Sequence, residues 1–240
     1  MSASPGAIWH DVECGSYAAE LVLREELAEA ADGPVLELGC GTGRVLLHLA
    51  RRGYEGVGLD RDPELIATLR GRCSGHPVTT VLADARDFTV DREVALALAP
   101  TQMLQLLPDA GARIECLRCV AAALRPGGRF AAAILEGMPE PDGAPPPLPD
   151  VREVDGWVYS SLAVEGAVGP GEIVVHRLRQ TVSPEGELAE EPNAIRIATF
   201  PAAQLEEEAA EAGLRPLERR EIPATDIHVG SVVVVLEKGP

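Results

Sequence analysis

Basic side chains are scarce in this sequence. It has 21 lysine and arginine residues against 38 aspartate and glutamate residues, and Lys238 is its single lysine. The formal net charge at pH 7 is -17. Proteins bind nucleic acids and anionic membrane surfaces through clustered cationic side chains, which neutralise phosphates. We therefore expect neither nucleic acid nor a membrane as a partner. A cationic or neutral small substrate suits this charge, although solubility alone also explains it.

Long apolar runs and an even set of cysteines are also lacking. No run approaches the roughly eighteen apolar residues of a membrane span. Five cysteines, together with the lack of an apolar signal segment after Met1, indicate a reducing, cytoplasmic location. Cys116 and Cys119 form a C-x-x-C pair, but no second pair of ligands accompanies it. We therefore expect helix thiols and no metal site.

The most informative motif is a glycine-rich turn in the first third of the chain. Residues 34–38 are apolar apart from one glutamate, and Gly39, Gly41 and Gly43 follow them. Residues 44–52 then show the apolar spacing of a helix. Glycines permit left-handed backbone angles and let a ligand approach the main chain closely. The free N–H groups of a helix N-terminus then point at that ligand. A buried strand, a ligand-binding turn and a helix are predicted.

The spacing of the glycines distinguishes between cofactors. A dinucleotide-binding turn that starts at Gly39 needs glycine or alanine at position 44, where this sequence has Arg44. The pattern E-x-G-x-G-x-G, which begins at Glu37, instead resembles the first motif of class I S-adenosylmethionine-dependent methyltransferases. This cofactor has no pyrophosphate, so a carboxylate near the turn is tolerated. A purely structural turn or a degenerate nicotinamide site are the alternatives. The resemblance places Glu37, Gly39, Cys40, Gly41 and Gly43 at the cofactor.

A second strand, 56–60, ends in a carboxylate. Asp60 follows Gly39 by about the twenty residues that separate a glycine turn from a ribose-binding acid. A carboxylate can accept hydrogen bonds from both ribose hydroxyls. The resemblance implies the same role for Asp60, with Arg61 beside it in the cofactor site. A solvated residue at a strand end is the alternative.

Two further strands lead into loops that the resemblance assigns to the cofactor. Strand 78–82 precedes Asp84 and Ala85, which in this family would accept from the adenine amine and donate a backbone N–H to an adenine ring nitrogen. Strand 94–99 ends at Ala99, whose carbonyl would meet the amino group of the cofactor. Loops at the carboxyl ends of parallel strands meet at one edge of the sheet, where such sheets bind ligands.

The loop after this fourth strand bears on the acceptor. Residues 100–108 lack the N/D-P-P-Y pattern of methyltransferases that modify nucleic-acid amines or glutamine. A small-molecule acceptor is therefore expected, with Thr101 and Gln102 as the polar groups that face it. Farther on, the turn 124–128 matches the L-x-P-G-G turn that precedes strand five in this family.

The N-terminal residues predict a lid. After a short polar arm, residues 16–31 have helical spacing. In the resembling family a helix here covers the cofactor pocket, and one of its aromatic residues often touches the methionine end of the ligand. The candidates are Trp9, His10 and Tyr17. Ordinary helix packing is the alternative for each of them.

The C-terminal part predicts a β insertion and the end of the core. Residues 137–149 are rich in proline and glycine and indicate a linker. The next elements are expected as strands 157–164, 173–182 and 194–199, a helix over 201–212, and strands 217–222 and 231–237. The predicted fold is α/β: a Rossmann-like, seven-stranded, mostly parallel sheet flanked by helices, with an antiparallel β insertion after strand five. The expected divisions are a lid helix and cofactor-binding core (1–136), the insertion (137–199) and the closing helix and strands (200–240).

The function that these motifs predict is methyl transfer from S-adenosylmethionine to an N, O or C atom of a small molecule. Weak candidates for a general base are Glu136, His176 and His228. Weak candidates for substrate contact are Trp9, Gln102, Trp157 and Tyr159. The insertion is expected to cover the acceptor, and its alternative role is to form a homodimer through free strand edges. The alternative function is a catalytically silent domain that binds the cofactor and acts through protein partners.

Overall fold

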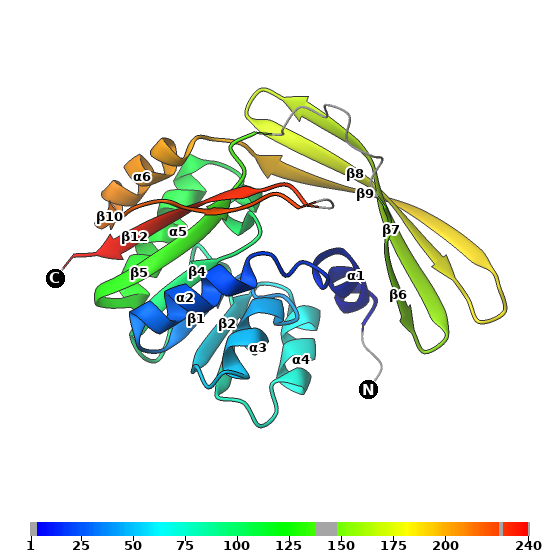
Figure 1. The fold of residues 1–240 in the computed structure, drawn as a ribbon, viewed down its shortest axis with the longest axis horizontal. Coiled ribbons are helices and arrows are strands. Elements are labelled where there is room, and N and C mark those ends of the chain that lie inside the picture. Colours follow the sequence, from blue (N-terminus) through cyan, green and yellow to red (C-terminus); the bar gives the residue numbers. More distant parts are fainter. Residues whose placement is uncertain (1–3, 138–147, 226–227, 240) are drawn as a thin grey trace.

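Two separate β-sheets make up the fold (Figure 1). The computed structural model describes residues 4–137, 148–225 and 228–239. The larger sheet has the strand order β10-β12-β5-β4-β1-β2-β3, with β11 beside β12. Its strands are β1 (Val35–Leu38), β2 (Gly56–Asp60), β3 (Val78–Leu82), β4 (Val94–Ala99), β5 (Leu124–Ile134), β10 (Leu214–Pro216), β11 (Arg220–Ile222) and β12 (Ser231–Lys238).

The larger sheet confirms the predicted Rossmann-like fold. Strands β1 to β5 pair in parallel, and β12 runs antiparallel to β5. Of the predicted strand 217–222 only β11 forms, and another short strand, β10, precedes the predicted range; both pair with β12. The strand order reverses between β1 and β4, since the chain builds outward from β1 to β3 and then returns. Ligands of open parallel sheets bind at the carboxyl ends of the strands at such a point.

Helices cover both faces of this sheet (Figure 1). Leu23 and Leu27 pack against one face together with Leu49, while Leu117 and Leu205 pack against the other. The first face carries α2 (Leu21–Ala31), α3 (Arg44–Ala50) and α4 (Pro63–Arg72). The second carries α5 (Ala110–Ala123) and α6 (Ala202–Glu211). A short 3-10 helix, η1 (Met103–Leu106), follows β4. Burial on both faces explains why β1 and β4 are almost entirely apolar.

The insertion is an antiparallel sheet that extends away from the core (Figure 1). Its strands, in sheet order, are β6 (Asp150–Val154), β7 (Trp157–Gly169), β8 (Glu172–Val182) and β9 (Leu188–Ala198). Three of the four correspond to predicted strands, and β6 is additional. The predicted linker 137–149 falls mostly on residues 138–147, which lie outside the described residues.

The N-terminal segment differs from the predicted polar arm. Residues Pro5–Cys14 form helix α1, because Ser4 accepts a hydrogen bond from the Ala7 amide and Pro5 occupies the first turn. The predicted helix 16–31 begins only at Leu21. In Figure 1, α1 lies between the core and strands β6 and β7.

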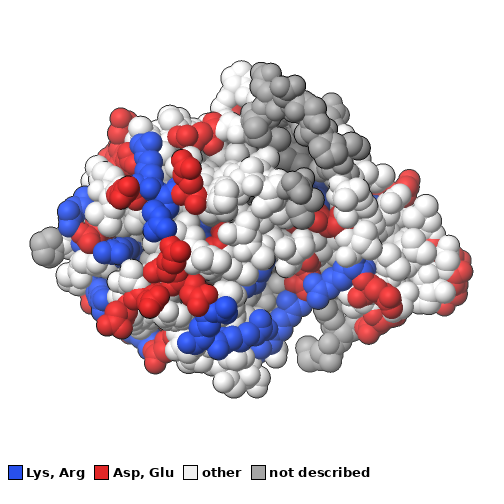
Figure 2. All heavy atoms as spheres, viewed as in Figure 1, with Lys and Arg blue, Asp and Glu red and all other residues white. Residues whose placement is uncertain are grey.

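Charged side chains of both signs lie close together on the surface. Figure 2 shows acidic and basic side chains interspersed on the face that it displays. Within the described residues, no helix is long and apolar enough to cross a bilayer. The same residues hold no group of three or more His, Cys, Asp or Glu side chains that could bind a metal ion. All five cysteines are described, and each is a free thiol.

Candidate active site

A cavity of about 640 Å³ lies at the carboxyl ends of β1, β2 and β4. Seven of the predicted cofactor residues line it: Glu37, Gly39, Cys40, Asp60, Arg61, Asp84 and Ala85. The other four, Tyr17, Gly41, Gly43 and Ala99, are not among the lining residues. His10, Arg44 and Thr101 also line the cavity. Side chains that are far apart in the sequence therefore converge at the point where the strand order reverses.

The three glycines of the turn serve different purposes. All have positive φ, of 61° at Gly39, 54° at Gly41 and 96° at Gly43. A Cβ on Gly43 would lie 2.5 Å from Leu69 Cδ1, so this glycine permits helix packing. A Cβ on Gly39 would lie 2.8 Å from Met103 Cγ, and one on Gly41 would overlap the imidazole of His10. Gly39 and Gly41 thus allow side chains at the cavity to approach the main chain.

Asp60 is held in place by backbone donors on both sides. Its Oδ2 accepts a hydrogen bond from the Gly41 amide at 2.9 Å, and its Oδ1 accepts one from the Asp62 amide at 2.9 Å. The residue is only 9% exposed. Each carboxylate oxygen has two lone pairs, so both oxygens can accept a further hydrogen bond from a ligand in the cavity.

Glu37 is a buried carboxyl group whose second oxygen has no partner. It is 2% exposed, and no described residue donates to its Oε2. Burial raises the pKa of Glu37 to about 8, with the charge of Glu20 adding to this rise and that of Arg44 opposing it. The carboxyl group is therefore protonated at pH 7. A buried polar atom without a partner, next to a cavity, fits a ligand that would complete its hydrogen bonds.

Asp84 forms an ion pair that the sequence did not predict. Its two oxygens accept from the Nε and Nη2 atoms of Arg86 at 2.9 and 2.8 Å, and the Arg86 amide donates to the same carboxylate at 2.9 Å. These hydrogen bonds lower the pKa of Asp84 to about 2. The carboxylate is thus ionised and oriented at the cavity, and Arg86 lines the cavity beside it.

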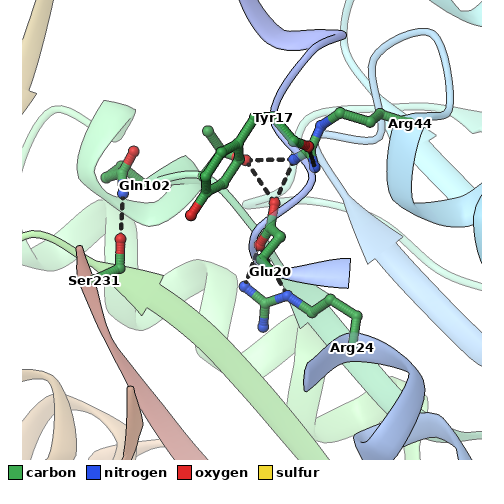
Figure 3. A network of polar contacts seen from close by, with 7 residues as sticks. Tyr17, Glu20, Arg24, Arg44, Gln102 and Ser231 are labelled. Carbon is green, nitrogen blue, oxygen red and sulfur yellow. Dashed lines mark hydrogen bonds and ion pairs between the residues drawn. The ribbon is translucent and has the colours of Figure 1, made fainter. Parts of the chain in front are cut away.

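A buried polar network joins three segments beside the cavity (Figure 3). Glu20 and Arg24 are both 0% exposed, and Arg24 donates to Glu20 Oε2 through Nε and Nη2 at 3.0 and 2.7 Å. Arg44 also pairs with Glu20, and it donates to the Tyr17 carbonyl at 2.7 Å and to Thr101 Oγ1 at 2.8 Å. The network connects the start of α2, the start of α3 and the loop after β4.

The sequence offered one signal for this network. Glu20 and Arg24 are four residues apart, which is the spacing of ion pairs on a helix. In the sequence, the third member, Arg44, indicates only that the turn is not a dinucleotide-binding one. Its contact with Thr101 spans 57 positions, and no local pattern predicts it.

The loop after β4 has two consecutive non-glycine residues with left-handed backbone angles. Thr101 has φ 50° and Gln102 has φ 58°, a combination that costs free energy and often marks functional sites. Thr101 lines the cavity. Gln102 instead donates to Ser231 Oγ at 2.9 Å, at the start of β12 (Figure 3). The loop is therefore fastened to α3 through Arg44 and to β12 through Ser231.

The residues singled out as weak catalytic candidates lie away from the cavity lining. Glu136 accepts a hydrogen bond from the Ala202 amide at 2.6 Å and so stabilises the start of α6. His176 is exposed on β8. His228 packs edge-on against Tyr17, with ring centroids 4.6 Å apart, and burial lowers its pKa.

The aromatic candidates join α1 to the insertion. The rings of Trp9 and Tyr159 meet edge to face with centroids 5.3 Å apart. Arg179 lies over the Trp9 ring at 5.1 Å and donates to Glu13 through two nitrogens at 2.8 and 2.9 Å. Trp157 is 41% exposed on β7. None of these side chains is among the residues that line the cavity.

Comparison with known proteins agrees with the class that the fold and the cavity define. Residues 35–128 match the family model of a methyltransferase domain. An uncharacterized methyltransferase of Mycobacterium tuberculosis is 35% identical over 133 residues, which cover 54% of this chain and 51% of that protein. A ubiquinone biosynthesis O-methyltransferase of Xylella fastidiosa is 36% identical over 99 residues, or 40% of this chain and 39% of that protein. The matches thus span about half or less of these relatives.

Solved structures match over nearly the whole chain. A sugar N-methyltransferase from Streptoalloteichus superposes with a TM-score of 0.77 at 18% identity, covering 100% of this chain and 94% of that one. An amino pentose methyltransferase from Micromonospora echinaspora, solved with S-adenosylmethionine bound, has a TM-score of 0.74 at 18% identity and 96% coverage of both chains. These structures confirm the predicted Rossmann-like methyltransferase fold, and the match of residues 35–128 to a methyltransferase domain agrees with it.

Proposed function

We propose that this protein transfers a methyl group from S-adenosylmethionine to a small-molecule acceptor. The observation that carries the proposal is the cavity where the strand order reverses. A glycine turn, a fixed Asp60 carboxylate and a protonated Glu37 meet there. S-adenosylmethionine supplies an already activated methyl group, so the protein mainly binds and orients the two reactants for an in-line displacement.

We assign the cofactor contacts to residues that converge on the cavity. The free lone pairs of Asp60 suit the ribose hydroxyls, and Asp84 with the Ala85 amide suits the adenine edge. Backbone groups of Gly39 and Cys40, which line the cavity, would hold the amino acid end, and Arg61 would lie beside Asp60 near the ribose. Glu37 lies near this end and can donate or accept, because burial keeps its proton in place.

We place the acceptor in the part of the cavity next to Thr101. Two of the structural neighbours are a sugar N-methyltransferase and an amino pentose methyltransferase. An amino sugar is therefore the first acceptor to test. An amine that reaches the site uncharged needs no general base. This fits Glu136, which already accepts a backbone hydrogen bond. The insertion, with Trp157, Tyr159 and His176, would cover the acceptor.

Turnover with methyl-labelled S-adenosylmethionine tests this proposal. The protein is incubated with a panel of amino sugars and hydroxylated metabolites, and S-adenosylhomocysteine and labelled products are measured by mass spectrometry. We expect stoichiometric formation of both with at least one acceptor. Binding of the cofactor with no product from any acceptor class would instead favour the catalytically silent domain. Heat-denatured protein and reactions without acceptor serve as controls.

A further inference from the structure

His10 lines the cavity, and of the three aromatic candidates for contact with the cofactor it is the one whose side chain does so. It lies on helix α1, outside the β–α units that make up the methyltransferase domain. A Cβ built on Gly41 would overlap its Nε2 atom, so the imidazole rests directly on the glycine turn. The Gly41 amide in turn donates to Asp60. His10 and Asp60 thus flank the same glycine at the cavity.

A chain of hydrogen bonds fixes the tautomer of His10. The hydroxyl of Thr42 donates its single proton to Asp11 Oδ1 at 2.6 Å. Asp11 accepts only, because its hydrogen bonds with Arg72 and Thr42 outweigh the effect of burial and lower its pKa. In the 3.3 Å hydrogen bond between Thr42 Oγ1 and His10 Nδ1, the donor must therefore be Nδ1–H and the acceptor Oγ1. Nε2 is left with a free lone pair.

Burial favours the neutral form of this imidazole. Burial lowers the pKa of His10 below its ordinary value of 6.5. Asp11 on its own helix and Asp60 at the end of β2 oppose this effect, while Arg44 on α3 and Arg72 on α4 reinforce it. A neutral Nδ1–H tautomer can only accept at Nε2. The ligand group that meets Nε2 must therefore be a hydrogen-bond donor.

We propose that Nε2 of His10 accepts a hydrogen bond from a ribose hydroxyl of the bound cofactor, beside the Asp60 carboxylate. This inference rests on the proposed function, since it names one more contact to the same ligand. A ribose diol presents two O–H donors, and His10 and Asp60 provide acceptors on the two sides of Gly41. Thr42 acts as a positioning residue, because it selects the tautomer.

Calorimetric titrations with S-adenosylhomocysteine and its 2′-deoxy and 3′-deoxy analogues test this contact. His10→Phe keeps an aromatic ring but removes the acceptor, and we expect it to weaken binding of S-adenosylhomocysteine by about three- to tenfold. With the deoxy analogue that lacks the contacted hydroxyl, wild type and His10→Phe should bind equally. Thr42→Val should weaken binding of S-adenosylhomocysteine in the same way, whereas His76→Phe, outside the cavity lining, serves as a matched control.

The outcomes separate this contact from the cofactor site itself. Equal losses for S-adenosylhomocysteine and both deoxy analogues in His10→Phe would overturn the contact, because His10 would then only support the fold or touch another part of the ligand. Unchanged affinity of His10→Phe for S-adenosylhomocysteine would overturn it as well. If wild type itself does not bind S-adenosylhomocysteine, the proposed function fails, and the inference fails with it.

Discussion

The amide of Gly41 donates a hydrogen bond of 2.9 Å to the carboxylate of Asp60. This bond joins the turn after β1 to the end of β2, so the two loops are fixed relative to each other before any ligand arrives. Preorganised polar groups bind a ligand with a smaller entropic cost than mobile ones. A substitution at Gly41 should therefore disturb both the geometry of the two loops and the shape of the cavity.

Gly41→Ala should destabilise the protein more than a glycine substitution at an uncrowded left-handed position. At Gly41 the new Cβ would collide with His10, in addition to the strain of φ 54°. Gly53 has φ 93° but nothing within 4 Å of its Cβ position, so Gly53→Ala measures the strain alone, about 1 kcal/mol. Urea denaturation should show an extra cost of about 1–3 kcal/mol for Gly41→Ala. Equal losses of free energy of unfolding in the two variants would contradict the close contact between His10 and Gly41. In a His10→Ala background the excess should disappear.

Glu37 should make stability depend on pH. Its pKa is raised from 4.5 to about 8, so the folded state keeps a proton that the unfolded state loses as pH rises. The stability that the folded state gains from holding this proton is fully present below pH 4.5 and is lost as pH rises toward 8. Glu37→Gln stays neutral throughout. Between pH 5 and pH 8, wild type should therefore lose stability relative to Glu37→Gln by on the order of 1 kcal/mol per pH unit. Denaturation curves at several pH values measure the difference in free energy of unfolding between the two proteins. A difference that did not change with pH would show that Glu37 is ionised in the folded protein.

Glu20→Gln should be among the most destabilising single substitutions near the cavity. It removes the negative charge that Arg24 and Arg44 share, and Arg24 is fully buried. Breaking a buried ion pair costs about 3–5 kcal/mol. The matched control is Glu26→Gln on the same helix, whose pair with Arg220 is largely exposed and should contribute less than about 1 kcal/mol. Chemical denaturation that gave both variants similar midpoints would refute this ranking.

The two aromatic residues at the start of β7 should behave differently. Tyr159 packs against Trp9, so Tyr159→Ala should lower stability by at least the 0.5–1.5 kcal/mol or so of an aromatic pair. Trp157 is 41% exposed, and Trp157→Ala should leave stability and cofactor affinity unchanged while raising the acceptor KM. Steady-state kinetics and calorimetry separate these effects. If Trp157→Ala changed only the oligomeric state, the insertion would be a dimerisation layer and not a cover for the acceptor.

The core of the fold was predictable because its signals are local. The glycine turn, the strand-end carboxylates and the L-x-P-G-G turn each lie within a few residues, and the carboxyl ends of parallel strands must meet at one edge. Helix α1 also had a local signal, Ser4 followed by Pro5, which marks a helix start but stands next to the chain end. Strand β6 was missed because it directly follows a proline-rich stretch.

Contacts between distant segments could not be predicted from the same patterns. The pair of Glu13 with Arg179 spans 166 positions, and that of Arg113 with Glu208 spans 95. Their residue types are common on surfaces, and only folding shows that they are largely buried. The tautomer of His10 likewise depends on Thr42, 32 positions away. Local patterns therefore predicted that loops of the β–α units meet at one cavity, whereas they did not predict the side chains that position these loops.

The most direct test of the account is calorimetric titration of S-adenosylhomocysteine into wild type, Asp60→Ala and Asp109→Ala. Asp109 caps α5 by accepting from the Ala112 amide at 2.8 Å, and it controls for a lost carboxylate outside the cavity lining. We predict saturable binding at one site per chain, unchanged in Asp109→Ala and weakened in Asp60→Ala by about 2–4 kcal/mol, roughly 30- to 1000-fold. Absence of saturable binding to wild type, or equal affinity in all three proteins, would contradict the claim that this cavity binds S-adenosylmethionine.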